Sequence, residues 1–157
     1  MTGTAASVHL PPVAGQYVFA GTVTLPSSSA WTPLTPTSSA ASDHTITESG
    51  LYLVTADTRA AISCPPGSNV WVVGAVARNG TPIAGSEHLA NQVIADPLSA
   101  QGSNQTGGVN FLVFLTAGDV LSMVSAARGN TTVAGVSAQV TTNGDGYTRA
   151  SWVRVRF

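Results

Sequence analysis

The residues Val-Asn-Phe-Leu-Val-Phe-Leu-Thr at positions 109–116 decide the fold class of this chain. Apolar side chains fall on both alternating faces: Val109, Phe111, Val113 and Leu115 on one, Leu112 and Phe114 on the other. A strand that is wet on one side alternates apolar with polar residues, so this strand should be covered on both faces. Because no stretch of the chain has a convincing helical period, we expect another copy of the chain to supply the second cover.

Strand-like alternation recurs on either side of this segment, at residues 16–25, 51–60, 70–78, 81–92, 120–127 and 148–157. Asn79-Gly80, between two extended runs, is a strong signal for a hairpin turn. Glycine-rich turns and many short strands predict an all-β jelly-roll sandwich of about eight to ten strands. We expect this single domain to span residues 15–157, after an extended arm of residues 1–14 that ends in His9-Leu10-Pro11-Pro12.

The composition excludes several classes of protein. The 157 residues suit one domain, the net charge is -1, and no basic run is present, which excludes binding of nucleic acid or anionic lipid by charge. The apolar runs are too short for a membrane-spanning helix, and the first residues do not resemble a secretion signal. Only 8% of the residues are charged, against about 25% in an average soluble chain. A surface with so little charge favours self-association.

The basic residues are all arginine, and lysine is absent. Arginine is enriched in protein interfaces and lysine is depleted from them, which favours a surface that packs against other chains. A coding sequence rich in G and C explains the same preference equally well.

Residues that carry chemistry are sparse and scattered. His9, His44 and His88 lack metal-ligand spacing, and Cys64 is the single cysteine, so we expect no metal site, cofactor or disulfide. No nucleophile motif, phosphate loop or carboxylate pair is visible, so we expect no enzymatic activity. Asn143-Gly-Asp145-Gly has one carboxylate of a calcium loop without its partners, and we interpret it as a turn.

Four segments resemble the complement-type globular head, whose fold is shared with the tumour necrosis factor ligands. These are Ser49-Gly50-Leu51-Tyr52-Leu53-Val54, residues 72–81 ending in Asn-Gly-Thr, Leu115-Thr-Ala-Gly118-Asp119-Val120, and Ser151-Trp152-Val-Arg-Val-Arg-Phe157. The family usually has Phe-Ser-Gly-Phe in its last strand, where this chain has arginines. The resemblance implies a ten-stranded jelly roll that forms a compact homotrimer, with one sheet of each subunit facing the three-fold axis.

We predict that aromatic and arginine residues of the strands line this trimer interface: Tyr17, Phe19, Tyr52, Phe111, Phe114, Trp152, Arg154 and Arg156. The alternation of the last segment presents Trp152 beside Arg154 and Arg156, residue types that interfaces favour. A cation–π stack on a wet surface is the alternative interpretation of these three residues.

The chain also resembles small virion proteins of bacteriophages that infect actinobacteria. The resemblance implies a homotrimeric capsid decoration protein, assembled in the host cytoplasm and bound to the major capsid protein. We predict that the arm holds the capsid through Val8, His9, Leu10, Pro11 and Pro12. The alternative is a tail or fibre tip whose loops, residues 26–42 and 95–107, recognise a host surface glycan or protein.

Overall fold

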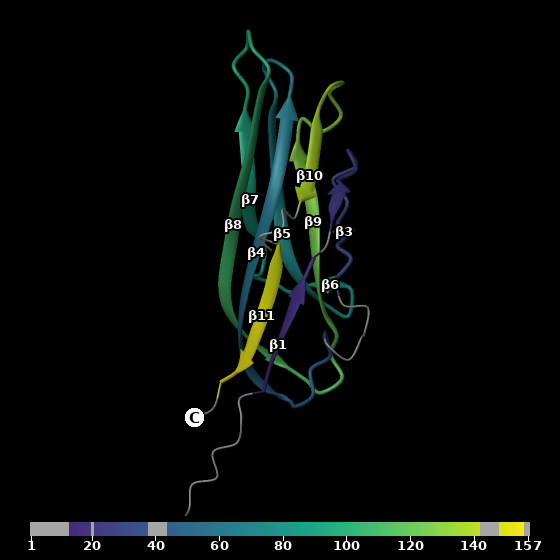
Figure 1. The fold of residues 1–157 in the computed structure, drawn as a ribbon, viewed down its shortest axis with the longest axis vertical. Helices are drawn as coiled ribbons and strands as arrows, with labels where there is room; N and C mark the ends of the chain where they lie inside the picture. The colour runs from purple at the N-terminus through teal and green to yellow at the C-terminus, as the bar shows by residue number, and fades with distance from the viewer. Residues whose placement is uncertain (1–12, 20, 38–43, 142–147, 156–157) are drawn as a thin grey trace, which may run out of the picture.

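Antiparallel β-strands make up the fold in the computed structural model, which describes residues 13–19, 21–37, 44–141 and 148–155 (Figure 1). In these residues the strands are β1 (Ala14–Val18), β2 (Thr22–Thr24), β3 (Thr32–Pro33), β4 (Gly50–Cys64), β5 (Asn69–Arg78), β6 (Thr81–Pro82), β7 (His88–Ile94), β8 (Gln101–Leu115), β9 (Leu121–Gly129), β10 (Ser137–Thr141) and β11 (Arg149–Arg154). No described segment is a helix that is long and apolar enough to cross a bilayer.

The first sheet is four strands wide, and two of these four positions are each occupied by two short strands that lie end to end. β8 pairs with the whole of β4 on one side, from Gly50 opposite Leu115 to Cys64 opposite Gln101. On the other side, β11 pairs with residues 52–57 of β4 and β10 with residues 60–63, so β10 and β11 lie end to end. β1 pairs with β11 and β2 with β10, and they form the outermost position in the same way.

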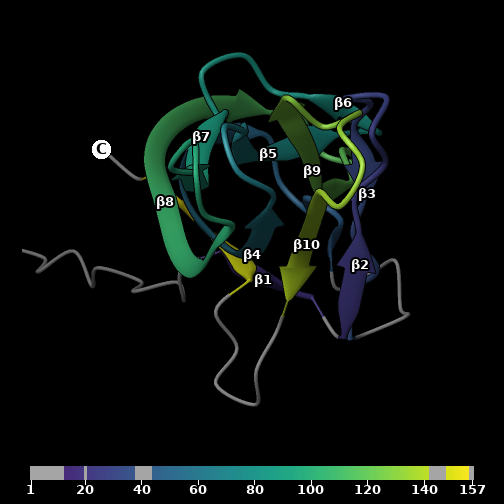
Figure 2. The same cartoon turned by 90° about the horizontal axis from the view of Figure 1, so that it is seen from above.

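The second sheet has the order β3, β9, β5 and β7, with the short β6 beside the end of β5. If β1 with β2 and β10 with β11 each count as one strand, and the short β6 is left out, the sandwich has eight strands in chain order. In that numbering the first sheet has the order one, eight, three, six, and the second has the order two, seven, four, five. This interleaving is that of a jelly roll. Figure 2 looks down the long axis, where β8 curves round one side of the sandwich. The expected all-β jelly roll is therefore confirmed.

The core lies between the two sheets, and alternation of side chains decides which residues enter it. In β4, the inward side chains are buried and alternate with outward ones; the inward set is Tyr52, Val54, Ala56, Thr58, Ala60 and Ile62. β5 differs because its residues from Val72 to Ala77 are buried on both faces. On its outward face, Trp31 from the β2–β3 connection packs against Ala75, Ala77 and Val124.

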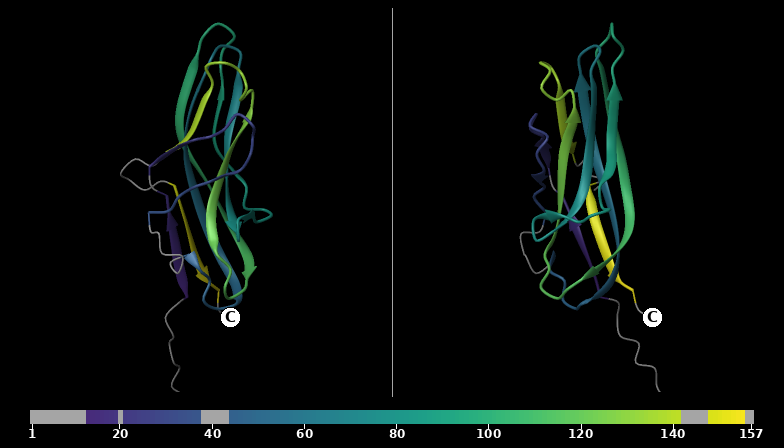
Figure 3. Two further views of the ribbon diagram at one scale, coloured as in Figure 1. Left: turned by 90° about the vertical axis from the view of Figure 1, so that its right-hand side faces the viewer. Right: turned by 180° about the vertical axis from the view of Figure 1, so that it is seen from behind.

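Two predicted strand boundaries are wrong. Residues 101–107, expected in a loop, form the first half of β8, because they continue the backbone pairing with β4 despite their polar side chains. Residues 81–92 are not one return strand: β6 ends at Pro82, a turn contains Gly85 at φ +82°, and β7 begins at His88. In the right view of Figure 3, β7 and β8 lie together along one long edge of the sandwich.

The described residues form one sandwich around one main core. β1 begins at Ala14, and the backbone of Val13 accepts a hydrogen bond from the N–H of Arg154 at 2.8 Å. The predicted arm of residues 1–14 lies mostly outside the described residues.

Candidate assembly interface

Apolar side chains form a row across the outward face of the first sheet, near the end that carries the β8–β9 turn. Strand register places Ala14 opposite Val153, Val153 opposite Leu53, and Leu53 opposite Leu112. The row therefore crosses β1, β11, β4 and β8. Leu53 is 40% exposed and Leu112 is 60% exposed, so water covers much of this apolar surface in a single chain.

A second apolar row lies beside the first, one step nearer the end of the sandwich. Leu51 pairs with Phe114, which is 62% exposed, and the N–H of Val155 donates to the carbonyl of Leu51 at 2.8 Å. We call the seven residues of both rows the apolar face: Ala14, Leu51, Leu53, Leu112, Phe114, Val153 and Val155.

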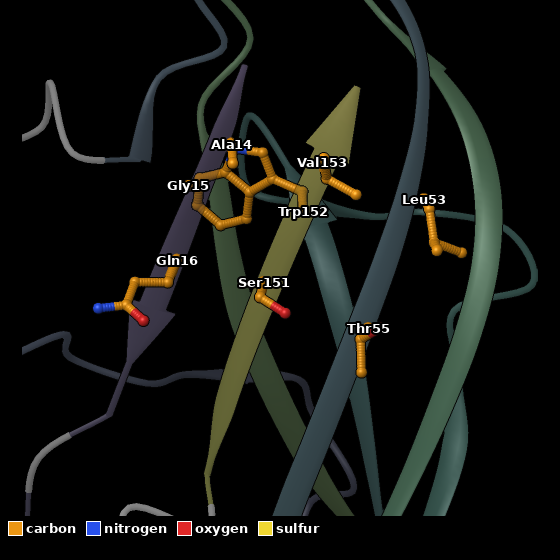
Figure 4. A pocket seen from close by; sticks show the side chains of 8 residues that line it. All are labelled: Ala14, Gly15, Gln16, Leu53, Thr55, Ser151, Trp152 and Val153. Carbon is orange, nitrogen blue, oxygen red and sulfur yellow. The ribbon is translucent and has the colours of Figure 1, made fainter. Parts of the chain in front are cut away.

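A shallow hollow of about 460 Å³ opens on this face between β1, β11 and β4 (Figure 4). Ala14, Leu53 and Val153 from the apolar face line it together with Gln16, Thr55 and Ser151. The three polar residues belong to the next row across the sheet, in which Gln16 pairs with Ser151 and Ser151 with Thr55. The hollow thus has an apolar half and a neutral polar half.

In the described part of the chain, the charged side chains of this sheet face lie farther along it. Arg149 Nε lies 3.4 Å from Asp57 Oδ2, and both side chains are accessible to water. An exposed pair of this kind contributes little stability, about 0–1 kcal/mol. The ion pair marks one border of the apolar face, which carries no charged side chain in its two rows.

Four of the predicted interface residues are core residues, which corrects their assignment. Tyr17, Phe19, Tyr52 and Trp152 are 0–4% exposed and point between the two sheets. The error for Trp152 was one of face: its strand pairs so that Val153, not Trp152, points outward. A residue buried within one subunit cannot contact a second copy, so Trp152 neither lines an interface nor takes part in a cation–π stack on a wet surface.

The remaining predicted interface residues have different positions. Phe114 lies on the apolar face, whereas Phe111 points inward and packs against the core. Arg154 lies at the end of the sandwich, where its Nη1 donates to Glu48 Oε2. Arg156 and the predicted capsid contacts Val8, His9, Leu10, Pro11 and Pro12 lie outside the described residues.

Sequence reasoning missed most of the apolar face. The two-faced pattern of residues 109–116 did indicate Leu112 and Phe114, and the structure places both on an open sheet face. Ala14, Leu53 and Val153 come from three segments far apart in the sequence, and only strand register brings them into one row, with Leu51 in the row beside it. The sequence shows which residues are apolar, but finding that they are neighbours across four strands requires the register of those strands.

Among the described residues, the groups most suited to chemistry are engaged in structure. His88 Nε2 lies 3.0 Å from the hydroxyl of Thr58, and its Nδ1 lies 3.1 Å from the carbonyl of Ser86. Burial lowers the pKa of His88, partly offset by the Ser86 carbonyl and by Asp57 and Glu87. No group of three or more His, Cys, Asp or Glu residues is arranged to hold a metal ion in the described ranges.

Comparison with known proteins gives similarity of fold only. No family model matches the chain, and no curated protein matches it. Solved structures that resemble it include the Eiger TNF of S. frugiperda, at 16% identity over 94% of both chains with a TM-score of 0.44. Murine APRIL at pH 8.5 shows 12% identity over 92% of this chain and 100% of that chain, with a TM-score of 0.47.

Proposed function

We propose that the protein is a non-enzymatic structural protein that assembles as a homotrimer through the apolar face of its first sheet. The observation that carries this proposal is the pair of apolar rows across β1, β11, β4 and β8, with Leu112 and Phe114 more than half exposed. Complete burial of a leucine or phenylalanine contributes about 1.5–3 kcal/mol, so a few such side chains provide a substantial driving force.

The polar surroundings support association rather than general insolubility. Contiguous apolar patches are uncommon on soluble monomers and usually mark an interaction surface. Here the patch is bordered by Gln16, Ser151 and Thr55, and beyond them by the pair of Arg149 and Asp57. An apolar centre with a polar rim is the usual anatomy of a protein interface.

The number of copies comes from the sequence resemblance described above, which implies a three-fold assembly. The same source supports the biological role, a decoration protein that binds the major capsid protein of a bacteriophage in a virion assembled in the host cytoplasm. The arm residues Val8 to Pro12 are the proposed capsid contacts in this role.

Native mass spectrometry tests the assembly. We expect a dominant species of three 15.9 kDa chains at about micromolar concentration, where a specific interface of ordinary size is populated. A monomer under these conditions would refute the homotrimer. A dimer would retain the apolar face as an interface but overturn its three-fold arrangement.

Quantitative mass spectrometry of purified virions tests the role. Hundreds of copies per particle are expected of a decoration protein, whereas a handful would indicate a tail or fibre tip. Deletion of residues 1–12 should abolish capsid binding and leave the oligomer intact. If the truncated protein still binds capsids, the arm does not hold the shell.

A further inference from the structure

Two tryptophans and an arginine lie together on the outward face of the second sheet, on the opposite side of the sandwich from the apolar face. Trp71 of β5 pairs with Arg128 of β9 on one side and with Gln92 of β7 on the other. This row lies near the end where β5 begins, at the top of Figure 1. Trp71 and Arg128 are half-buried and Gln92 is exposed, so the row is open to water.

Arg128 joins the row to Trp31 of the β2–β3 connection. Its Cζ lies 5.0 Å from the centroid of the Trp31 ring, and its Nη1 donates to the carbonyl of Ser29. Among the described residues, neither Nε nor Nη2 of Arg128 has a hydrogen-bond acceptor, and no carboxylate pairs with the guanidinium. The Nε and Nη2 groups of the planar, charged guanidinium are therefore available as donors on this surface.

The Trp71 ring lies over the backbone of the neighbouring strand. A Cβ at Gly129 would come within 2.7 Å of Trp71 Cζ3, and Gly129 has φ +86°, so a glycine is needed at this position. The indole thus rests against Gly129, and Trp71 as a whole is half-buried. Trp31 is held in a comparable way, against Ala75, Ala77 and Val124.

Neutral hydrogen-bonding groups complete the surface. Gln92 Nε2 donates to Asn69 Oδ1 over 3.2 Å, and Asn69 precedes Trp71 on the same outward face. A side-chain amide has two N–H donors and one oxygen acceptor, so Gln92 and Asn69 can each form a further hydrogen bond to a hydroxyl group of a ligand.

We propose that Trp31, Trp71, Arg128, Gln92 and Asn69 form a binding site for an acidic saccharide, one that contains a uronic or sialic acid. The electron-rich face of an indole attracts the weakly positive C–H face of a pyranose ring. The free Nε and Nη2 of Arg128 match the two oxygens of a sugar carboxylate. The amides of Gln92 and Asn69 fix orientation through hydroxyl groups, as a few polar groups do in ligand sites.

The charge balance favours a saccharide over a nucleic acid, the other ligand that stacks on tryptophan. Nucleic-acid binding needs several cations along a phosphate backbone, whereas this surface carries one arginine and the chain has a net charge of -1. A single carboxylate on a sugar ring matches a single unpaired guanidinium. The inference does not depend on the proposed trimer or on capsid binding, because all five residues belong to one chain and face away from the apolar face.

A glycan microarray with neutral, uronic-acid-containing and sialylated oligosaccharides, probed with the full chain, tests this site. We expect binding to acidic members in preference to neutral ones of similar length. Titration of the best acidic member, followed by tryptophan fluorescence, should show that Trp71→Ala weakens binding about tenfold or more and that Trp71→Phe keeps part of it. Arg128→Gln should remove the preference for acidic over neutral sugars.

Thermal unfolding of each variant distinguishes loss of the site from loss of the fold. Leu98→Ala is the matched control, since Leu98 is 92% exposed at the same end of the sandwich but outside the row, and its binding should equal that of the unmodified protein. The site is refuted if no acidic saccharide on the panel binds, if folded Trp71→Ala binds unchanged, or if a single-stranded oligonucleotide binds more tightly than any saccharide.

Discussion

The indole of Trp152 occupies the space that a side chain at Gly15 would fill. The two residues pair across β1 and β11, and a Cβ on Gly15 would lie 2.5 Å from Trp152 Cε2. This contact holds the tryptophan within the core at 4% exposure and keeps β1, an edge strand, close to the rest of the sheet.

Substitution of Gly15 by alanine should therefore destabilise the sandwich. We expect a loss of about 1–3 kcal/mol in the free energy of unfolding, because a methyl group would force the indole or β1 to move. Urea denaturation measures the loss. Gln16→Ala is the control at the next, exposed position, where a change within about 0.5 kcal/mol is expected. Equal stability of Gly15→Ala and the unmodified protein would contradict the observed packing.

Acidification should weaken the fold through His88. The Ser86 carbonyl can only accept, so Nδ1 carries the proton of the neutral ring, and Nε2 accepts from Thr58. Burial lowers the pKa of His88 below its ordinary value of 6.5, despite Asp57 and Glu87 nearby. The unfolded chain thus binds more protons than the folded chain, and stability falls as the pH drops below about 6.5.

Urea denaturation at pH 7.5 and at pH 5 measures this His88 effect. In His88→Gln, the part of the difference that comes from the imidazole should vanish, even if the variant is less stable at both values. The control Glu87→Gln removes an exposed neighbouring charge and should retain the pH dependence, since burial of His88 is unchanged. An identical pH dependence in His88→Gln and the unmodified protein would exclude His88 as the cause.

Charge on the apolar face should dissociate the proposed assembly. Leu112→Asp places a carboxylate at the β8 end of the row, where its burial between subunits would cost several kcal/mol. Native mass spectrometry should show a shift from oligomer to folded monomer. Leu98→Asp introduces the same charge outside the face and should leave the oligomer intact. If Leu112→Asp assembles as well as the control, the interface lies elsewhere.

Loss of the Asp119 carboxylate should loosen one end of the sandwich. Its Oδ2 accepts from the Thr116 N–H at 2.9 Å and its Oδ1 from Asn79 Nδ2 at 3.0 Å, while Asn79 Oδ1 accepts from the Val120 N–H. These bonds join the β5–β6 and β8–β9 turns. Asp119→Ala should lower the free energy of unfolding by about 1–3 kcal/mol. Asp119→Asn retains one acceptor and should lose less, which differential scanning calorimetry can resolve.

Sequence patterns predicted the jelly roll because alternation is a local property. Residues 51–60 and 70–78 were expected as strands, and both lie within observed ones. Residues 101–107 were missed because Ser, Asn, Gln and Gly have no strand preference of their own, and pairing with β4 imposes the strand conformation. The Leu-x-x-Gly-Asp turn was visible as a motif, but its bonds to Asn79 depend on a turn far away in the chain.

By itself the sequence determined an all-β chain with little charge and a strand whose two faces are both apolar. Only the tertiary structure decided which aromatic residues are core and which face is open. Trp152 and Val153 are adjacent in the chain and have opposite environments, because successive side chains of a strand point to opposite faces of the sheet. Strand register then decides which of the two faces is buried, since a shift of one residue would exchange them. Register also assembles the first row of the apolar face, because Ala14, Val153, Leu53 and Leu112 come from four strands that no local sequence pattern connects.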